Sequence, residues 1–291
     1  MIPRSRLTLG AVVAVAAISS GAVLARLAGE AHPLAIAAWR LGLASLVLVP
    51  WAMLRGGWRR VTRADVLRSV ASGAALAVHF GLWITSLTQT SVASSVLFVT
   101  LHPLFVGVAA AALYNEPLTK NLTFGIAAST LGGLLLSIGD LRLGDGSWVG
   151  DLLALGGGLA AAVYFLIGRR ARIRMPLVEY TAIAYGSATL LLLAACVFGG
   201  IRLHGYSQAT FGALLLLALI PQLVGHSTLN WALRYLPAAR VSLLVLAEPI
   251  GAGVLAFTLF GEVPTWLGGL GAAIILLGLF VAGRRKESVH G

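Results

Sequence analysis

Several side chains that could bind a ligand lie inside stretches of the chain that are otherwise apolar. Gln222, His226 and Asn230 are spaced four residues apart, so on an α-helix they share one face. His79 and Trp83 have the same spacing, and an imidazole beside an indole suits a ligand with an apolar body and a polar head. Polar groups in lipid usually face a bundle interior or a cavity, so both sets predict a cavity wall. Helix–helix hydrogen bonding is the alternative for the first set, and a satisfied buried histidine with an interfacial tryptophan for the second.

Three further residues could line the same cavity: Ser20, Tyr164 and Trp39. Trp39 could equally anchor its helix at the membrane–water interface, where tryptophan is enriched.

The charged candidates within apolar stretches are Arg40, Glu248 and His102. Glu248 could bind a substrate ammonium, accept a proton or pair with a buried cation, and Arg40 could pair with it or bind a carboxylate. His102 and Glu248 stand directly before Pro103 and Pro249. Because a proline removes one backbone hydrogen bond and kinks its helix, each position leaves a carbonyl free for another partner.

Motifs for metal binding or catalysis are absent from the sequence. Three histidines in apolar stretches lie on three different segments without a thiolate or carboxylate at ligand spacing, so we expect no metal site. The chain has no Walker A loop, no Gly-x-Ser-x-Gly elbow and no His-Glu-x-x-His. We therefore expect no cofactor and no enzymatic activity. The single cysteine, Cys196, excludes a disulfide framework.

The elements that carry these residues must be membrane helices. The 291 residues are 58% hydrophobic and 11% charged, with a mean hydropathy of +0.92, whereas a soluble domain is about half apolar and about a quarter charged. Apolar runs of about 18–25 residues, long enough to cross the hydrocarbon core, recur along the chain. They predict an all-α polytopic membrane protein with ten transmembrane helices, at about 7–28, 33–54, 66–86, 92–114, 121–139, 149–168, 177–199, 210–231, 239–260 and 266–283.

The net charge of +11 follows the membrane topology. With the N-terminus inside, the inner segments hold seventeen of the twenty-one Lys and Arg residues, and the outer loops keep Arg142 and Arg202. The positive-inside rule then predicts that both termini are cytoplasmic. No basic face interleaved with aromatic residues is present, so we expect no nucleic-acid partner.

An internal repeat divides the chain into two halves. A shift of 146 residues pairs Ala93–Gly132 with Ala239–Gly278 without a gap, and fourteen of the forty columns are identical. The period contains five spans, and an odd number reverses orientation. We therefore predict two inverted five-helix repeats, 1–140 and 147–286, around a central cavity, a plan common among secondary transporters.

The repeat also pairs residues at the helix ends. Glu116 and Glu262 end matching helices at opposite membrane surfaces, and with Pro103 and Pro249 we assign them to gates or structural turns. The repeated glycines, Gly125 and Gly132 with Gly271 and Gly278, lie two helical turns apart and predict close helix packing.

These segments resemble a known family. The runs HPLFVGVAAAALYNEPLTKNLTFGIAASTLGGLLL and AEPIGAGVLAFTLFGEVPTWLGGLGAAIILLGLF are similar to the two EamA repeats of the drug/metabolite transporter superfamily, with a proline in the helix, a glutamate at its far end and a glycine-bearing last helix. Pro33 followed by Arg40 also fits, whereas Ser19-Ser20-Gly21 departs from the Trp-Gly-Ser type sequence of many members. Within the superfamily, the aromatic and broad amino-acid exporters (YddG-like) are the most similar group.

The resemblance implies a multi-pass transporter of the bacterial cytoplasmic (inner) membrane, with a small-molecule substrate, the lipid bilayer as its surroundings and no obligate protein partner. One buried cation, one buried anion and several aromatic residues favour export of small zwitterionic metabolites, above all amino acids, by alternating access. Efflux of lipophilic cationic drugs is an alternative, because it requires a membrane carboxylate such as Glu248. A non-transporting membrane enzyme or scaffold is a second alternative, from another class.

Overall fold

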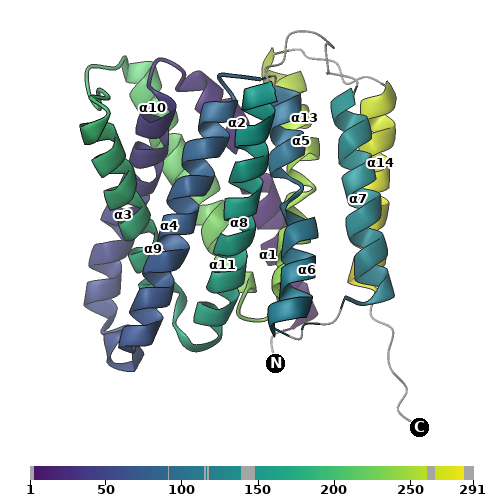
Figure 1. The fold of residues 1–291 in the computed structure, drawn as a ribbon, viewed down its shortest axis with the longest axis horizontal. Helices are drawn as coiled ribbons and strands as arrows, with labels where there is room; N and C mark the ends of the chain where they lie inside the picture. The colour runs from purple at the N-terminus through teal and green to yellow at the C-terminus, as the bar shows by residue number, and fades with distance from the viewer. Residues whose placement is uncertain are drawn as a thin grey trace.

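The computed structural model describes residues 3–90, 92–114, 116, 118–138, 148–260 and 266–284, and every regular element in these ranges is helical (Figure 1). In chain order the helices are α1 (Arg4–Ile18), α2 (Gly21–Leu27), α3 (Pro33–Arg55), the 3₁₀ turn η1 (Gly57–Arg60), α4 (Arg63–Ser86), α5 (Val92–Val99), α6 (His102–Tyr114), α7 (Lys120–Ile138), α8 (Trp148–Arg174), α9 (Leu177–Phe198), α10 (Gln208–Leu217), the π-helix η2 (Ala218–His226), α11 (Ser227–Ala232), α12 (Ala238–Val245), α13 (Glu248–Phe260) and α14 (Trp266–Gly283).

Eight segments of the described ranges are long and apolar enough to cross a membrane. They are Ser5–Leu27, Pro33–Arg55, Arg63–Ser86, Trp148–Arg174, Leu177–Phe198, Gln208–Ala232, Ala238–Leu259 and Trp266–Gly283. α6 is a shorter apolar helix. The prediction of a polytopic, all-helical membrane protein is confirmed, and eight of the ten predicted spans meet these criteria.

Four predicted spans are irregular where the sequence pattern suggested one continuous helix. The runs 92–114 and 239–260 each divide into two helices just before a proline, because Pro103 and Pro249 have no N–H to continue the backbone ladder. The first span is interrupted by a turn at Ser19–Ser20. The run 210–231 contains the nine-residue η2, in which backbone bonds span five residues instead of four.

The 146-residue offset reappears in the helix boundaries. α5 and α12 have the same bounds after the shift, and so do α6 and α13. α7 and α14 begin at matching residues. The sequence repeat therefore coincides with a repeat of secondary structure, including the break in the middle of each proline-containing span.

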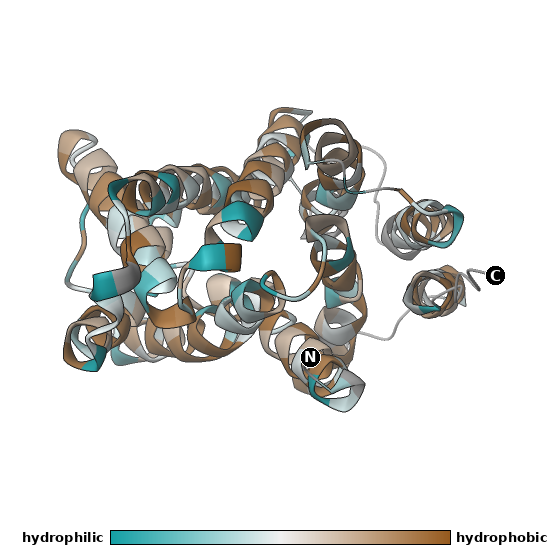
Figure 2. Ribbon diagram, turned by 90° about the horizontal axis from the view of Figure 1, so that it is seen from below, coloured by the Kyte–Doolittle hydropathy of each residue, from teal (hydrophilic) through white to brown (hydrophobic). Residues whose placement is uncertain are grey.

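α7 and α14 pack closely against each other at one edge of the molecule (Figures 1 and 2). A Cβ atom on Gly132 would lie 2.6 Å from the Gly271 carbonyl oxygen, and one on Gly278 would lie 2.8 Å from the Gly125 carbonyl oxygen. Without a hydrophobic force between helices in lipid, small residues stabilise such pairs by close van der Waals contact. The repeated glycines thus pack across the two copies of the repeat, Gly132 against Gly271 and Gly125 against Gly278.

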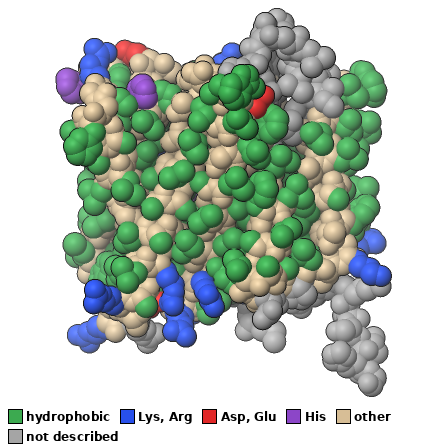
Figure 3. All heavy atoms as spheres, viewed as in Figure 1, with side chains coloured by type: hydrophobic (Ala, Val, Ile, Leu, Met, Phe, Trp, Pro, Cys, Tyr) green, Lys and Arg blue, Asp and Glu red, His purple; other side chains and the backbone are tan. Residues whose placement is uncertain are grey.

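α4 lies in contact with both α8 and α9 and supplies one wall of the interior. Gly157 of α8 allows this approach, since an added Cβ would lie 3.2 Å from the Trp83 backbone nitrogen and 3.3 Å from the His79 carbonyl oxygen. Apolar side chains cover the outer face that meets lipid (Figure 3). On the face shown, Lys and Arg side chains gather along the lower rim, the end at which α1 begins and α14 ends (Figures 1 and 3).

Candidate functional site

A small cavity of about 40 Å³ lies at the centre of the bundle. It forms where the irregular segments meet, because it is lined by residues on both sides of the α1–α2, α5–α6 and α12–α13 breaks and by the last residue of η2. The lining residues are Ile18, Gly21, Arg40, His79, Phe80, Trp83, Val99, Thr100, His102, Ala161, Tyr164, Phe165, His226, Leu229, Val245 and Glu248. Discontinuous helices at mid-membrane are typical of transporter binding sites.

Arg40 is the cation of the cavity, and its side chain is 1% exposed. Its Nε donates a 2.8 Å hydrogen bond to Oε1 of Gln222 on η2. The guanidinium carbon lies 4.0 Å from the centre of the Phe80 ring, a cation–π contact that strengthens when water is excluded. α3, α4 and η2 together therefore hold the guanidinium in place.

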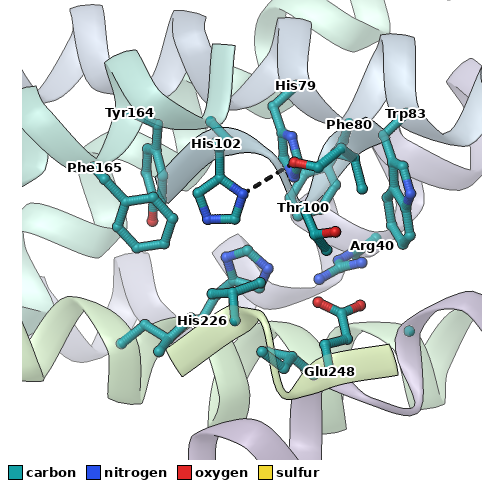
Figure 4. Close-up of a pocket in the computed structure, with 16 residues that line it drawn as sticks. Arg40, His79, Phe80, Trp83, Thr100, His102, Tyr164, Phe165, His226 and Glu248 are labelled. Atoms are coloured by element: carbon teal, nitrogen blue, oxygen red, sulfur yellow. Dashed lines mark hydrogen bonds between the residues drawn. The ribbon is translucent and has the colours of Figure 1, made fainter. Parts of the chain in front are cut away.

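Glu248 supplies the anion, and its carboxylate and the Arg40 guanidinium point toward one another (Figure 4). Among the described residues, ion pairs have a nitrogen and an oxygen atom within 4.0 Å of each other, and Arg40 and Glu248 do not form such a pair. Opposite charges so arranged attract each other strongly in a medium of low dielectric constant. Ser19, at the end of α1, donates a 3.2 Å hydrogen bond to the Glu248 carbonyl and fixes the start of α13.

His102 satisfies the carbonyl that Pro103 leaves free. Its Nδ1 lies 3.0 Å from the Val99 carbonyl oxygen, the atom that a residue with an N–H at position 103 would bond in an α-helix (Figure 4). A carbonyl only accepts, so Nδ1 carries the hydrogen, and in the neutral ring Nε2 is an acceptor. His79 is held in the same tautomer by the Gly157 carbonyl, 2.9 Å from its Nδ1.

Aromatic rings form most of the remaining wall. The His102 ring stacks on Phe165 with centroids 5.5 Å apart, and the His79 ring is parallel to Trp83 at 6.2 Å. His226 meets the Phe80 ring nearly edge-on at 5.2 Å. The wall thus offers a large apolar surface with a few polar atoms in defined directions.

Three polar atoms of the lining are buried without a protein hydrogen-bond partner: Trp83 Nε1, His102 Nε2 and His226 Nδ1. Buried polar groups are nearly always paired, so these atoms are available to a ligand or to water. One is a donor, the indole N–H, and the neutral His102 Nε2 is an acceptor. The cavity can therefore accept a hydrogen bond from one group of a ligand and donate one to another.

Four predicted cavity residues lie outside this lining. Gln222 and Asn230 are fully buried behind it: Gln222 holds Arg40, while Asn230 Nδ2 donates to the hydroxyl of Tyr164 at 2.5 Å. The prediction that these two residues share a face with His226 assumed a regular α-helix. Instead, η2 is a π-helix that ends at His226, so its side chains point in different directions from those of an α-helix.

The other two form local contacts. The Ser20 hydroxyl donates to the Ala17 carbonyl at 2.8 Å. Trp39 Nε1 donates to the Leu203 carbonyl at 2.9 Å, and its ring packs edge-on against Phe211. Trp39 thus ties α3 to the loop before α10.

Glu116 links two helices at the end of the bundle where α1 begins. One carboxylate oxygen accepts a 3.0 Å bond from Arg169 Nε on α8, and the other accepts a 3.1 Å bond from the backbone N–H of Ala238, the first residue of α12. Arg169 also donates to the Leu233 carbonyl at 2.8 Å. The repeat counterpart, Glu262, lies outside the described residues.

Sequence reasoning missed several lining residues, among them Phe80, Thr100 and Phe165. Phe80 and Phe165 are ordinary apolar residues of membrane helices, and their neighbours His79 and Tyr164 were the local signals. Arg172 lies beyond the predicted span 149–168, but α8 extends to Arg174, and Arg172 is 1% exposed. Its Nε donates a 3.0 Å hydrogen bond to the Asn230 carbonyl.

The fold and the site define a polytopic membrane transporter, in which broken helices enclose a polar cavity within an apolar bundle. The sequence profile of the EamA-like transporter family matches residues 6–138 and again 148–284. The chain therefore belongs to the EamA-like transporter family, as the resemblance predicted, and membership indicates a transporter rather than an enzyme.

Known relatives agree with this assignment. An uncharacterized transporter of Archaeoglobus fulgidus is 22% identical over 262 residues, covering 89% of this chain and 90% of the relative. A probable terminal-alkyne amino-acid exporter of Streptantibioticus cattleyicolor is 25% identical over 194 residues, 65% of this chain and 63% of the relative. A solved crystal structure has the same fold, with a TM-score of 0.81, 19% identity and 97% of each chain covered.

Proposed function

We propose that this protein exports zwitterionic small metabolites, above all amino acids with aromatic or other apolar side chains. The observation that carries the proposal is the arrangement of Arg40 and Glu248, which point toward one another in one cavity without forming an ion pair. An α-amino acid carries a carboxylate and an ammonium on one carbon, so it matches a cation and an anion that face each other in one cavity.

Neighbouring groups assist each end of such a substrate. The Trp83 N–H can donate to a carboxylate beside Arg40. Glu248 and the neutral His102 Nε2 can accept hydrogen bonds from an ammonium, and the Phe80 and Phe165 rings can cover an apolar side chain.

The cavity is too small for the proposed substrate, so transport requires a change of conformation. A water molecule requires roughly 10–15 Å³ of such volume, so about 40 Å³ holds a few waters and no amino acid. The substrate must therefore enter a more open conformation. We assign the Glu116–Arg169–Ala238 contact to the gate that closes one end, with Pro103 and Pro249 at the hinges of the broken spans.

We extend the proposal to the topology of the chain. The eight long spans, together with α5–α6 and with α7, make ten, in two inverted sets at 1–140 and 147–286. The cation distribution supports cytoplasmic termini in a bacterial inner membrane. The Streptantibioticus cattleyicolor relative, a probable terminal-alkyne amino-acid exporter, supports export as the direction of transport and amino acids as the substrate class.

Counterflow in proteoliposomes tests the substrate class. We expect labelled phenylalanine or tryptophan to exchange, and we expect excess amino acid to compete far better than its decarboxylated amine or its deaminated acid, because each analogue lacks one charge. Arg40→Gln and Glu248→Gln should each abolish exchange. Equal competition by the amine, with transport that survives Arg40→Gln but not Glu248→Gln, would support efflux of lipophilic cations instead.

A further inference from the structure

A second and larger hollow opens on the side of the bundle, at the end where α1 begins. Its volume is about 1090 Å³, and it shares no lining residue with the central cavity. We call it the lateral groove. It is lined by Arg6, Leu9, Gly10, Val13, Val47, Leu48, Trp51, Arg55, Gly57, Arg172, Pro176, Leu177, Val178, Glu179, Thr181, Leu223, Ser227, Thr228, Trp231, Arg234 and Tyr235.

The groove has the depth of one membrane leaflet. Along α1 it reaches from Arg6 to Val13, and along α3 from Arg55 to Val47. At 1.5 Å per residue these stretches are about 10–12 Å long, and half of the hydrocarbon core is about 15 Å thick. Exposed apolar side chains line this depth, with Leu9 64% and Trp51 48% exposed.

Positive charge gathers at one end of the lateral groove, the end where α1 begins, which we call its mouth. Arg6, Arg55 and Arg234 line it and are exposed. The one carboxylate among the described lining residues is Glu179, which is 3% exposed. Arg172 is buried and donates to the backbone carbonyls of Asn230 and Met175, so it is occupied within the protein.

We propose that the lateral groove is a binding site for one anionic phospholipid of the adjoining leaflet. The acyl chain lies along Leu9, Val47 and Trp51, and the phosphate lies between the exposed arginines at the mouth. The charge of the mouth selects this occupant over a zwitterionic lipid, since one arginine near the headgroups favours an anionic lipid about fivefold. Apolar walls one leaflet deep below a basic rim match the two parts of such a lipid.

Tryptophan fluorescence can test this site directly, because Trp51 and Trp231 lie in the groove. The full-length protein is reconstituted in nanodiscs of phosphatidylcholine with a small fraction of brominated phosphatidylglycerol or brominated phosphatidylcholine. The groove signal is the difference between wild type and Trp51→Phe/Trp231→Phe. We expect the anionic lipid to quench this signal at a membrane fraction that is about one fifth, or less, of the fraction that the zwitterionic lipid requires.

The charge dependence separates a built site from general attraction to a basic surface. Replacing Arg6, Arg55 and Arg234 by Gln should make the two lipids quench equally. The matched control replaces three exposed arginines that do not line the groove, Arg63, Arg170 and Arg284, and should keep the preference. Three results would each overturn the proposal. They are equal quenching by the two lipids in wild type, equal effects of the two triple variants, and weak quenching by both lipids because another chain covers the groove.

Discussion

The Ser129 hydroxyl donates a 3.3 Å hydrogen bond to the carbonyl of Ile275, the residue 146 positions later and hence its own counterpart in the repeat. α7 and α14 meet at this point, so the two copies of the sequence repeat contact each other through equivalent residues.

Gly132→Val should destabilise that contact. The new side chain would meet the Gly271 carbonyl oxygen and the Ile275 nitrogen at 2.6 and 2.8 Å from its Cβ, and backbone atoms cannot rotate away. Overpacking of this kind costs about 1–3 kcal/mol, so the melting temperature in detergent should fall by several degrees. Gly133→Ala is the matched control, because nothing lies within 4 Å of its added Cβ. Equal melting temperatures for the two variants would contradict the close packing.

Gln222→Leu should weaken substrate binding although Gln222 does not line the cavity. It removes the acceptor of the 2.8 Å bond from Arg40 Nε, and hydrogen bonds to charged groups contribute about 1.5–3 kcal/mol. We expect the KM of counterflow to rise about tenfold or more, with a smaller change in maximal rate. A KM that stays at the wild-type value in Gln222→Leu would exclude a positioning role.

Glu116→Gln should favour opening of the gate at the end where α1 begins. The variant keeps a hydrogen-bonding group but loses the charge that faces Arg169, and with both partners 18% exposed the effect should be about 1 kcal/mol, or roughly fivefold in population. A cysteine at the cavity residue Leu229, in a Cys196→Ala background, reports access to a maleimide added on that side. Labelling should be faster in Glu116→Gln. Arg68→Gln breaks an ion pair within a single helix turn and should leave the labelling rate unchanged.

Glu30 should make stability depend on pH at the opposite end of the bundle. Its pKa is lowered by the hydrogen bond from the Ser207 backbone N–H, at 2.9 Å, and next by that from the Thr210 hydroxyl, at 2.7 Å. A carboxylate with a lowered folded-state pKa contributes stability above its usual value of 4.5, and this contribution is lost as the pH falls through the lowered value. Melting temperatures of wild type and Glu30→Gln should therefore converge in acid and separate above about pH 5. Parallel curves would show that the contact does not stabilise the fold.

Much of this protein was determined by the sequence alone. Hydropathy identifies the spans because a backbone in lipid must form helices, and the length of a span is set by the thickness of the bilayer. The repeated prolines predicted a kink in two spans, each of which the structure divides into two helices. The rare charges in apolar stretches, Arg40 and Glu248, indicated the cavity, because a charge in lipid is costly unless it has partners or a function.

The tertiary structure decided which of these residues meet. Gln222 and His226 share a helix, yet one holds Arg40 and the other lines the cavity, because η2 changes the number of residues per turn. The partnership of Ser129 with Ile275, and of Glu116 with Arg169, joins segments far apart in the chain. Local patterns determine which face of a helix is polar, but the partner of that face depends on how all the helices pack, so the cavity around Arg40 and Glu248 emerges only in the folded bundle.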